Sequence, residues 1–223
     1  AVWLDSLPEW DGRDRVAELA ATVPTEWEMW QEMFAIWMRA LVSQWRGING
    51  MYGATMVMML TGEQGTRKST FCRRLMPPEL MPYYTDRLDF TNKRDAERAL
   101  TRFCLINLDE FDQISQRQTA FLKHMLQKSS VAYRKMYQNE IEQTRRYAAF
   151  CATTNSNTPL TDPTGSRRYM VVEVTGAIDT TYEIDYAQLY AQVLAEVHAG
   201  RVSFFDSQKE HSIMEHNISY TEE

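Results

Sequence analysis

The sequence predicts an α/β fold in which a mostly parallel sheet lies between two layers of helices. Short apolar runs alternate with helix-like stretches along the middle of the chain, which is the pattern of strands joined by crossover helices. With 223 residues, 44% of them hydrophobic and 24% charged, the chain has a globular composition and is long enough to bury a core of its own. These observations exclude disordered chains, collagens and disulfide scaffolds.

Residues 1–50 are predicted to form an N-terminal helical segment. Six large apolar residues recur there at steps of three and four: Trp27, Trp30, Phe34, Trp37, Leu41 and Trp45. This spacing predicts an amphipathic helix over residues 26–46, which ends before the glycines of segment 48–53. We interpret the aromatic stripe as core packing, and a ligand-facing role is the alternative.

Residues 51–200 are predicted to form the core of alternating strands and helices. The predicted strands are 54–60, 103–108, 147–153 and 169–174. The predicted helices are 68–76, 116–127 and 186–199, of which the first is stopped by two prolines and the last by a glycine. Residues 201–223 are polar and acidic, and we expect them to be the start of a further C-terminal element that is cut off.

A glycine-containing segment, GEQGTRKS at residues 62–69, follows the first predicted strand and opens the next helix. Small residues let consecutive backbone N–H groups wrap phosphates, while a lysine and a hydroxyl at the helix start reach the outer phosphates and Mg²⁺. The alternative is an ordinary turn between a strand and a helix. We predict a phosphate-binding loop (P-loop) that holds ATP through the following residues: Gly62, Glu63, Gln64, Gly65, Thr66, Arg67, Lys68, Ser69 and Thr70.

One position departs from the pattern GxxxxGK[ST], which has glycine where Arg67 stands. If the backbone is left-handed there, a side chain costs about 1–2 kcal/mol. Either the loop absorbs this strain or it is partly degenerate.

The strand predicted at 103–108 delivers two carboxylates, Asp109 and Glu110, to its C-terminal end. Ligands of open α/β sheets bind at that edge. We predict that Asp109 and Ser69 hold Mg²⁺, and that Glu110 polarises the attacking water. Two acids after an apolar run are a weak signal alone, but together with a phosphate-binding loop they indicate a hydrolysis site.

Two further polar signals follow. Asn155 comes at the tip of the strand predicted at 147–153, where an uncharged amide can orient water or touch the γ-phosphate; the alternative is an Asn in a turn. Arg167 and Arg168 precede the last predicted strand, and an arginine supplied to developing phosphate charge in trans accelerates transfer by about 10³-fold or more. Paired arginines are more often surface salt-bridge donors.

Read together, these elements resemble the P-loop ATPases of the virulence-associated E (VirE-like) family of bacterial mobile elements and phages. That family is related to superfamily three helicases, a branch of AAA+-like ATPases. The resemblance extends from Leu4 to the pair His216 and Asn217, and these segments carry it: SLPEWDGRDR, GEQGTRKSTF, LMPPELMPYY, INLDEFD, YRKMY, ATTN and TDPTGSRRY.

The resemblance implies an ATPase that assembles into a homo-oligomer, possibly a hexamer, and translocates DNA. It implies that primase-like or other replication domains accompany this module. Lys68 and Ser69 match the family's phosphate loop, Asp109 and Glu110 its acidic pair, and Asn155 its sensor. Arg167 or Arg168 matches the arginine-finger position. Arg67 departs from the loop pattern, which bears on hydrolysis more than on nucleotide binding.

The formal net charge is −6, but residues 117–146 carry seven basic and two acidic side chains. Segment 131–150 is predicted to form a hairpin with its turn near Gln138 and Asn139. In superfamily three helicases the corresponding stretch carries a basic loop into the central channel, and tyrosines interleaved with the basic residues suit base stacking. We predict single-stranded DNA contacts from Lys128, Arg134, Lys135, Arg145 and Arg146. A solvated hairpin with core-facing tyrosines is the alternative.

Other chemistry finds little support in the sequence. The three cysteines lie in apolar runs and form no CxxC pair, which suits reduced, buried thiols and a cytoplasmic protein. No histidine has metal-ligand neighbours. Segment 51–60 is about half the ~20 residues that a membrane span needs, and no signal-peptide layout is present.

We therefore predict an ATP- and Mg²⁺-dependent ATPase, a DNA helicase or translocase module of a mobile-element or phage replication protein. The alternative is an ATP-binding assembly switch with little or no hydrolysis. Arg67 and the acidic net charge favour the switch, whereas the retained acids and Asn155 favour the motor. A small-molecule kinase fits poorly, because it leaves Asn155 and the paired arginines without a joint role.

Overall fold

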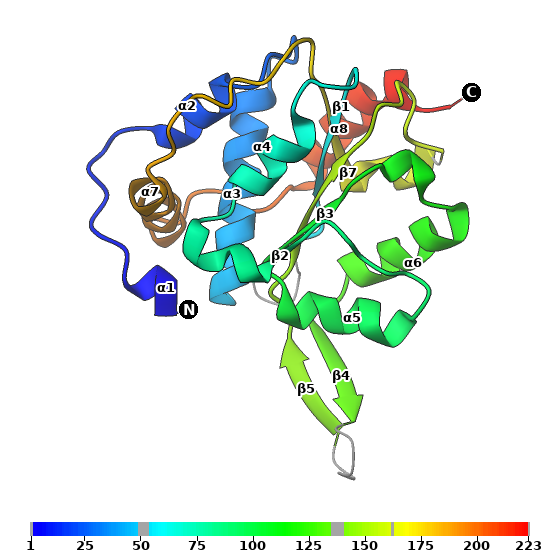
Figure 1. The fold of residues 1–223 in the computed structure, drawn as a ribbon, viewed down its shortest axis with the longest axis horizontal. Helices are drawn as coiled ribbons and strands as arrows, with labels where there is room; N and C mark the ends of the chain where they lie inside the picture. Colours follow the sequence, from blue (N-terminus) through cyan, green and yellow to red (C-terminus); the bar gives the residue numbers. More distant parts are fainter. Residues whose placement is uncertain (1, 49–53, 135–140, 162, 223) are drawn as a thin grey trace.

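The computed structural model describes residues 2–48, 54–134, 141–161 and 163–222. Helices cover both faces of a five-stranded sheet, and a two-stranded hairpin projects from one edge (Figure 1). The three-layer α/β fold predicted from the sequence is thereby confirmed. Within the described residues, no helix is both long and apolar enough to cross a membrane.

The elements run in the following order along the chain: α1 (Val2–Asp5), α2 (Arg15–Ala21), α3 (Trp30–Arg46), β1 (Val57–Thr61), α4 (Lys68–Arg74), η1 (Pro78–Tyr83), β2 (Tyr84–Thr85), α5 (Lys93–Arg102), β3 (Leu105–Leu108), η2 (Phe111–Gln113), α6 (Gln116–Leu126), β4 (Ser130–Arg134), β5 (Ile141–Arg145), β6 (Ala149–Thr153), η3 (Pro163–Arg168), β7 (Tyr169–Glu173), α7 (Tyr186–His198), α8 (Ser207–Asn217) and η4 (Ile218–Tyr220).

The large sheet has the strand order β2-β3-β6-β1-β7, and all of its pairs are parallel. The central strand β1 pairs with β6 on one side and β7 on the other, so that Leu60 lies opposite both Thr153 and Val172. Because the strands are parallel, the loops that follow β1, β3 and β6 all leave the sheet at one edge. Ligands of such sheets bind at this edge.

Alternate residues of each strand face opposite helical layers, as a strand buried on both faces requires. Met58 and Leu60 belong to the core beneath α2, α3, α4 and α7, whereas Val57 and Met59 belong to the core beneath α5 and α6. The sheet therefore separates two hydrophobic cores.

The predicted N-terminal and C-terminal segments pack onto this same sheet. The aromatic stripe of α3 is buried, with Trp30 and Trp37 at 3% and 2% exposure, which agrees with core packing. Arg39 of α3 and Glu196 of α7 form a buried ion pair at 2.7 Å. Residues 201–223 include α8, which contacts β7 and η3. Helix α5 and the short strand β2 were missed in the sequence.

Candidate functional site

The phosphate-loop segment connects β1 to α4 in the conformation that the sequence requires. Gly62 has φ 136°, and a Cβ placed on it would lie 2.6 Å from the backbone oxygen of Val174. Only glycine fits here without a shift of the neighbouring strand. Gly65 also has positive φ, at 87°, but its added Cβ would meet no atom within 4 Å.

Arg67 is left-handed, with φ 67° and ψ 27°, and directly precedes the first residue of α4. The strain expected for a non-glycine residue at this position is therefore present. Its guanidinium Nη1 lies 3.4 Å from Ile178 O and 3.3 Å from Thr180 Oγ1. Ile178 N also donates to Thr66 O at 3.1 Å, so two adjacent loop residues are tied to segment 178–180.

Lys68 begins α4 and is 6% exposed. Its Nζ donates to the carbonyl oxygens of Gly62 and Glu63, both at 2.7 Å, and lies 3.1 Å from Thr66 Oγ1 and from Asn155 Oδ1. Burial lowers the pKa of Lys68, and the nearby Asp109 carboxylate opposes this effect. The ammonium is thus held at the centre of the loop and linked to the strand that carries Asn155.

Three oxygen-bearing side chains converge beside Lys68. Ser69 Oγ donates to Asp109 Oδ1 at 2.7 Å, and the hydroxyl of Thr153 donates to the same carboxylate oxygen. Hydroxyl and carboxylate oxygens are the protein ligands that Mg²⁺ takes, so this donor set fits the ion. Thr153 was missed in the sequence, although its position at the carboxyl end of a buried strand placed it at the ligand edge.

Glu110 adds a second strained residue to the site. It has φ 52° and ψ 50°, and Arg67 and Glu110 are the only non-glycine residues with positive φ among those that the structure describes. Such residues cluster at functional sites because the surrounding structure must maintain them. This conformation places the exposed carboxylate of Glu110 on the wall of the cavity.

The loop after β6 brings Asn155 toward the phosphate loop. Thr154 N donates to Leu60 O at 3.0 Å, and the Thr154 hydroxyl donates to Asp112 at 2.7 Å. These bonds tie the loop both to β1 and to the segment that follows β3. Asn155 therefore directly follows a residue that both bonds hold in place.

A cavity of about 350 Å³ opens between these segments, within the range of small-molecule sites. It is lined by the following residues: Gln64, Gly65, Arg67, Lys68, Ser69, Thr70, Asp109, Glu110, Thr153, Thr154 and Asn155. The structure thus brings together the predicted lysine, serine, acids and sensor asparagine. Of the predicted loop residues, Gly62, Glu63 and Thr66 lie behind this lining and offer oxygens to Lys68.

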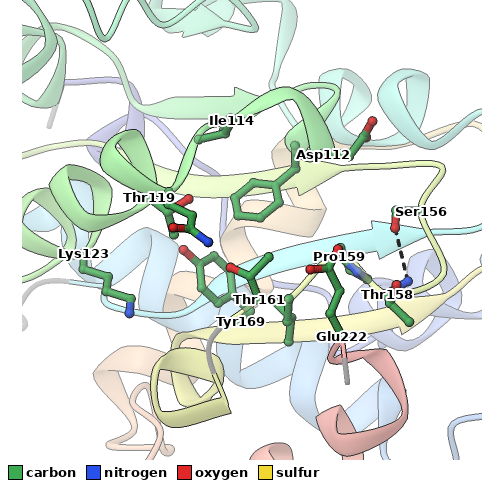
Figure 2. A pocket seen from close by; sticks show the side chains of 13 residues that line it. Asp112, Ile114, Thr119, Lys123, Ser156, Thr158, Pro159, Thr161, Tyr169 and Glu222 are labelled. Atoms are coloured by element: carbon green, nitrogen blue, oxygen red, sulfur yellow. Dashed lines mark hydrogen bonds between the residues drawn. The ribbon is translucent and has the colours of Figure 1, made fainter.

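A second cavity lies beyond the Thr154–Asp112 contact, between α6 and the segment that runs into η3 (Figure 2). Its walls include Thr119 and Lys123 of α6, Thr158, and Tyr169 at the start of β7. It holds about 100 Å³, which is below the size of a nucleotide site. The larger cavity is therefore the candidate site.

The sequence of the chain matches a known protein family. The family model for the virulence-associated protein E-like (VapE-like) domain matches residues 4–222. The chain belongs to this family. No curated protein sequence matches it.

Among solved structures, the VapE-like domain is similar to the C-terminal region of NrS-1, residues 305–718, in its apo form, with a TM-score of 0.56 at 12% identity. Two A-form apo structures of that region give TM-scores of 0.52 and 0.54 at 13% identity. The alignments cover 96% of this chain and 53–54% of the NrS-1 region, so the chain spans about half of that region. At this identity the likeness shows the fold.

In this VapE-like domain, Arg167 and Arg168 lie far from the cavity. They end η3 and directly precede β7, whose first residue pairs with Val57 and whose last pairs with Thr61. Four residue steps of about 3.3 Å place them roughly 13 Å or more from the edge where the phosphate loop begins. Arg167 is exposed and Arg168 is half-buried. Neither arginine lines the cavity.

The hairpin is present as an antiparallel pair of β4 and β5 at the edge opposite the phosphate loop (Figure 1). Its predicted turn near Gln138 and Asn139, and Lys135, lie outside the described residues, as does the side chain of Arg134. Lys128 pairs with Glu97 at 2.8 Å. Arg145 donates to Trp45 O at 2.8 Å and stacks 4.2 Å from the ring centre of Tyr147.

The prediction that Arg146 contacts nucleic acid is wrong. Its side chain has no exposed surface, and its guanidinium donates to the carbonyl oxygens of Ala148 at 2.6 Å, Ala54 at 2.8 Å and Leu126 at 2.9 Å. Burial lowers the pKa of Arg146. The residue fastens the root of the hairpin to α6 and to the segment before β1, so its role is structural.

Proposed function

We propose that this VapE-like domain binds and hydrolyses ATP with Mg²⁺, as the motor module of a mobile-element or phage replication protein that acts on single-stranded DNA. One observation carries the proposal. Lys68, Ser69, Asp109 and Asn155 come from the ends of three strands and meet within hydrogen-bond distance along one cavity. Few other chemistries need a buried lysine, a carboxylate–hydroxyl pair and an amide together at a helix start.

The roles follow from position. Backbone N–H groups of the loop and the ammonium of Lys68 would neutralise the β- and γ-phosphates. Ser69 and Asp109 would hold Mg²⁺, which when bound spreads the charge of the transferred group. Glu110, exposed on the cavity wall, would accept a proton from the attacking water. Asn155 would orient that water through its amide, since its Oδ1 is already fixed by Lys68.

Arg167 and Arg168 lie at the opposite edge, so an arginine finger from this pair would serve the site of a neighbouring subunit. The proposal therefore includes a homo-oligomer, with a hexamer as the state expected from the resemblance to superfamily three helicases. Single-stranded DNA would pass beside the β4–β5 hairpin. Primase-like or other replication domains would accompany the module in a longer protein.

Steady-state ATP hydrolysis with Mg²⁺, with and without single-stranded DNA, tests the proposal. Glu110→Gln keeps the size of the side chain and removes the base, so turnover should fall by about 10²–10⁴-fold while ATP binding persists. Glu28→Gln, an exposed acid outside the site, is the matched control. Retained turnover in Glu110→Gln, or absence of both ATP binding and turnover in the parent protein, would refute the assignment.

Mixing two inactive variants tests the arginine finger. Glu110→Gln retains both arginines but lacks the base, whereas the double variant Arg167→Ala/Arg168→Ala retains the base but lacks the finger. If the finger acts in trans, a mixture regains turnover at interfaces that combine an intact base with an intact arginine. A mixture as inactive as its components would refute the trans arrangement.

A second candidate function is an ATP-dependent assembly switch with little hydrolysis. The left-handed, non-glycine Arg67 in the phosphate loop favours it, because strain there alters how the loop wraps phosphate. Binding of ATP without turnover, coupled to a change in oligomeric state by light scattering, would distinguish the switch from the motor.

A further inference from the structure

Helix α5 carries a line of arginines, and the sequence pattern had not predicted this helix. Arg94, Arg98 and Arg102 follow one another at intervals of four residues, and all three are exposed. Residues four apart lie on the same side of a helix and about 6 Å apart along its axis. The three guanidinium groups therefore form one row about 12 Å long, which we call the arginine row.

The phase of the helix directs the arginine row into solvent. The buried residues of α5 are Ala96, Ala99 and Leu100, which pack into the core beneath α5 and α6. At 100° per residue, the row is centred on the side of the helix opposite these three residues. The helix is thus held to the sheet by its small apolar face, and the row cannot turn inward.

The acidic residues of α5 are engaged elsewhere. Asp95 Oδ2 accepts from Asn92 Nδ2 at 2.7 Å, beside the N-cap of the helix. Glu97 pairs with Lys128 at 2.8 Å and lies 3.8 Å from His124 Nε2. Both of the carboxylates that α5 carries therefore have partners outside the row.

The arginine row leads to the root of the hairpin. Leu100 O in the last turn of α5 accepts from Tyr147 N at 2.8 Å and from Ala148 N at 3.1 Å, in the segment that joins β5 to β6. Helix α5 also contacts β4. Figure 1 shows the C-terminal end of α5 directly above the hairpin. The row therefore lies along the approach to the hairpin.

We propose that the arginine row is a phosphate-binding track that holds single-stranded DNA beside the hairpin. The proposal rests on the DNA-directed function proposed above and assigns to it residues outside the hairpin. A row of about 12 Å matches the axial rise of three to four nucleotides in one strand of DNA. Regularly spaced guanidinium groups bind regularly spaced phosphates, and guanidinium is the side chain best suited to that contact.

The surroundings of the row favour a nucleic acid over a lipid surface. Membrane-surface helices combine basic residues with large exposed apolar residues. The large apolar side chains exposed in the described chain are Val2, Ile48, Tyr83, Val202, Phe204 and Ile218, and none of them lies on α5. The row thus offers charge without an apolar surface to insert into lipid.

Three basic residues that the sequence predicts as DNA contacts at the hairpin root are engaged within the protein. Lys128 is paired with Glu97, Arg145 is bonded to a backbone carbonyl, and Arg146 is buried. Residues that the sequence predicts as DNA contacts thus hold the hairpin in place. Three exposed arginines of the described chain lie on α5, which contacts β4.

Fluorescence anisotropy of the full chain with labelled oligodeoxythymidylate, at several salt concentrations, tests the proposal. The triple variant Arg94→Gln/Arg98→Gln/Arg102→Gln should bind on the order of tenfold or more weakly, since an exposed charge contact contributes about two- to fivefold. The slope of log affinity against log salt should fall in magnitude by about 2, from three phosphate contacts at about 0.7 each.

Two further variants keep the result interpretable. The triple variant Arg13→Gln/Arg201→Gln/Lys209→Gln removes the same charge from elements on the other face of the sheet, and should retain both affinity and salt slope. Replacement of the three row arginines by lysine keeps the charge, and should retain the slope. Circular dichroism and thermal melting confirm that each variant is folded.

Equal affinity of the row variant and the parent chain would overturn the proposal, as would an equal loss in the control variant or absence of DNA binding by the parent. A change of oligomeric state in the row variant, with DNA affinity retained, would assign the row to a protein interface instead. ATP turnover without DNA separates the two proposals, because the row variant should leave it unchanged. Loss of turnover in the parent chain would refute the ATPase assignment while the DNA measurement stands on its own.

Discussion

Replacement of Arg67 by glycine should make the protein more stable, although it removes two hydrogen bonds. Arg67 occupies the left-handed region at φ 67°, where an L-residue with a side chain is strained by about 1–2 kcal/mol. Glycine removes this strain. Glycine also lowers the free energy of unfolding by roughly 0.4–1 kcal/mol, because it increases the conformational freedom of the unfolded chain.

The hydrogen bonds lost with the side chain are weak. Their lengths, 3.3 and 3.4 Å, are beyond the usual range for N–H donors, and the side chain is exposed. We assign them less than about 0.5 kcal/mol together. The net effect expected for Arg67→Gly is an increase of about 0.5 kcal/mol in the free energy of unfolding. Arg67→Ala loses the same bonds and keeps the strain, so it should be roughly 1 kcal/mol less stable than Arg67→Gly.

Urea unfolding, followed by the fluorescence of the six tryptophans, measures the difference. With a slope of about 2.5 kcal/mol per M, a difference of 1 kcal/mol separates the two midpoints by about 0.4 M. The alanine variant is the control, because both variants lack the guanidinium. Equal midpoints for the two variants, or a glycine variant less stable than the alanine variant, would refute the assignment of backbone strain to Arg67.

Three other predictions concern stability. Gly62→Ala should lower the melting temperature much more than Gly65→Ala, because only the Cβ at Gly62 would meet Val174 O at 2.6 Å; similar losses would contradict this. Arg146→Met should cost about 3 kcal/mol or more in urea unfolding, since it leaves buried carbonyl oxygens without donors; a loss below 1 kcal/mol would contradict this. Burial lowers the pKa of His216. The contribution of this residue to stability is therefore present above the unfolded pKa near 6.5 and is lost as the pH falls below that value. His216→Gln should reduce the drop in melting temperature between pH 7 and pH 5.

The strands and the residues of the cavity could be predicted because both have local causes. Each longer strand of the large sheet is an apolar run bounded by polar residues. In a parallel sheet, the segments that follow the strands all start from the ligand edge, so the phosphate loop, Asp109 and Asn155 could be placed together without knowledge of the strand order. The order of strands could not be predicted, because it depends on contacts between segments far apart in the sequence.

Two misses have distinct physical reasons. Helix α5 has three buried residues among ten, two of them alanines, so its apolar periodicity is weak; Asn92 as N-cap was the available signal. Arg146 was misassigned because it adjoins other basic residues in a charged segment. Its burial depends on carbonyl oxygens contributed by α6 and by the segment before β1, which no local pattern reveals.

The fastening of the hairpin root has a mechanical consequence. Strand β5 runs through Arg146 into β6, and β6 ends two residues before Asn155, whose amide oxygen accepts from Lys68. Because β6 is hydrogen-bonded to β3 on one side and β1 on the other, it cannot bend between its ends. Asn155 and the root of the hairpin therefore lie at the two ends of one strand that is held on both sides, and Arg146, Tyr147 and Ala148 are bonded in turn to the elements around the root. The cavity and the hairpin root are thus two ends of a single rigid unit of the sheet.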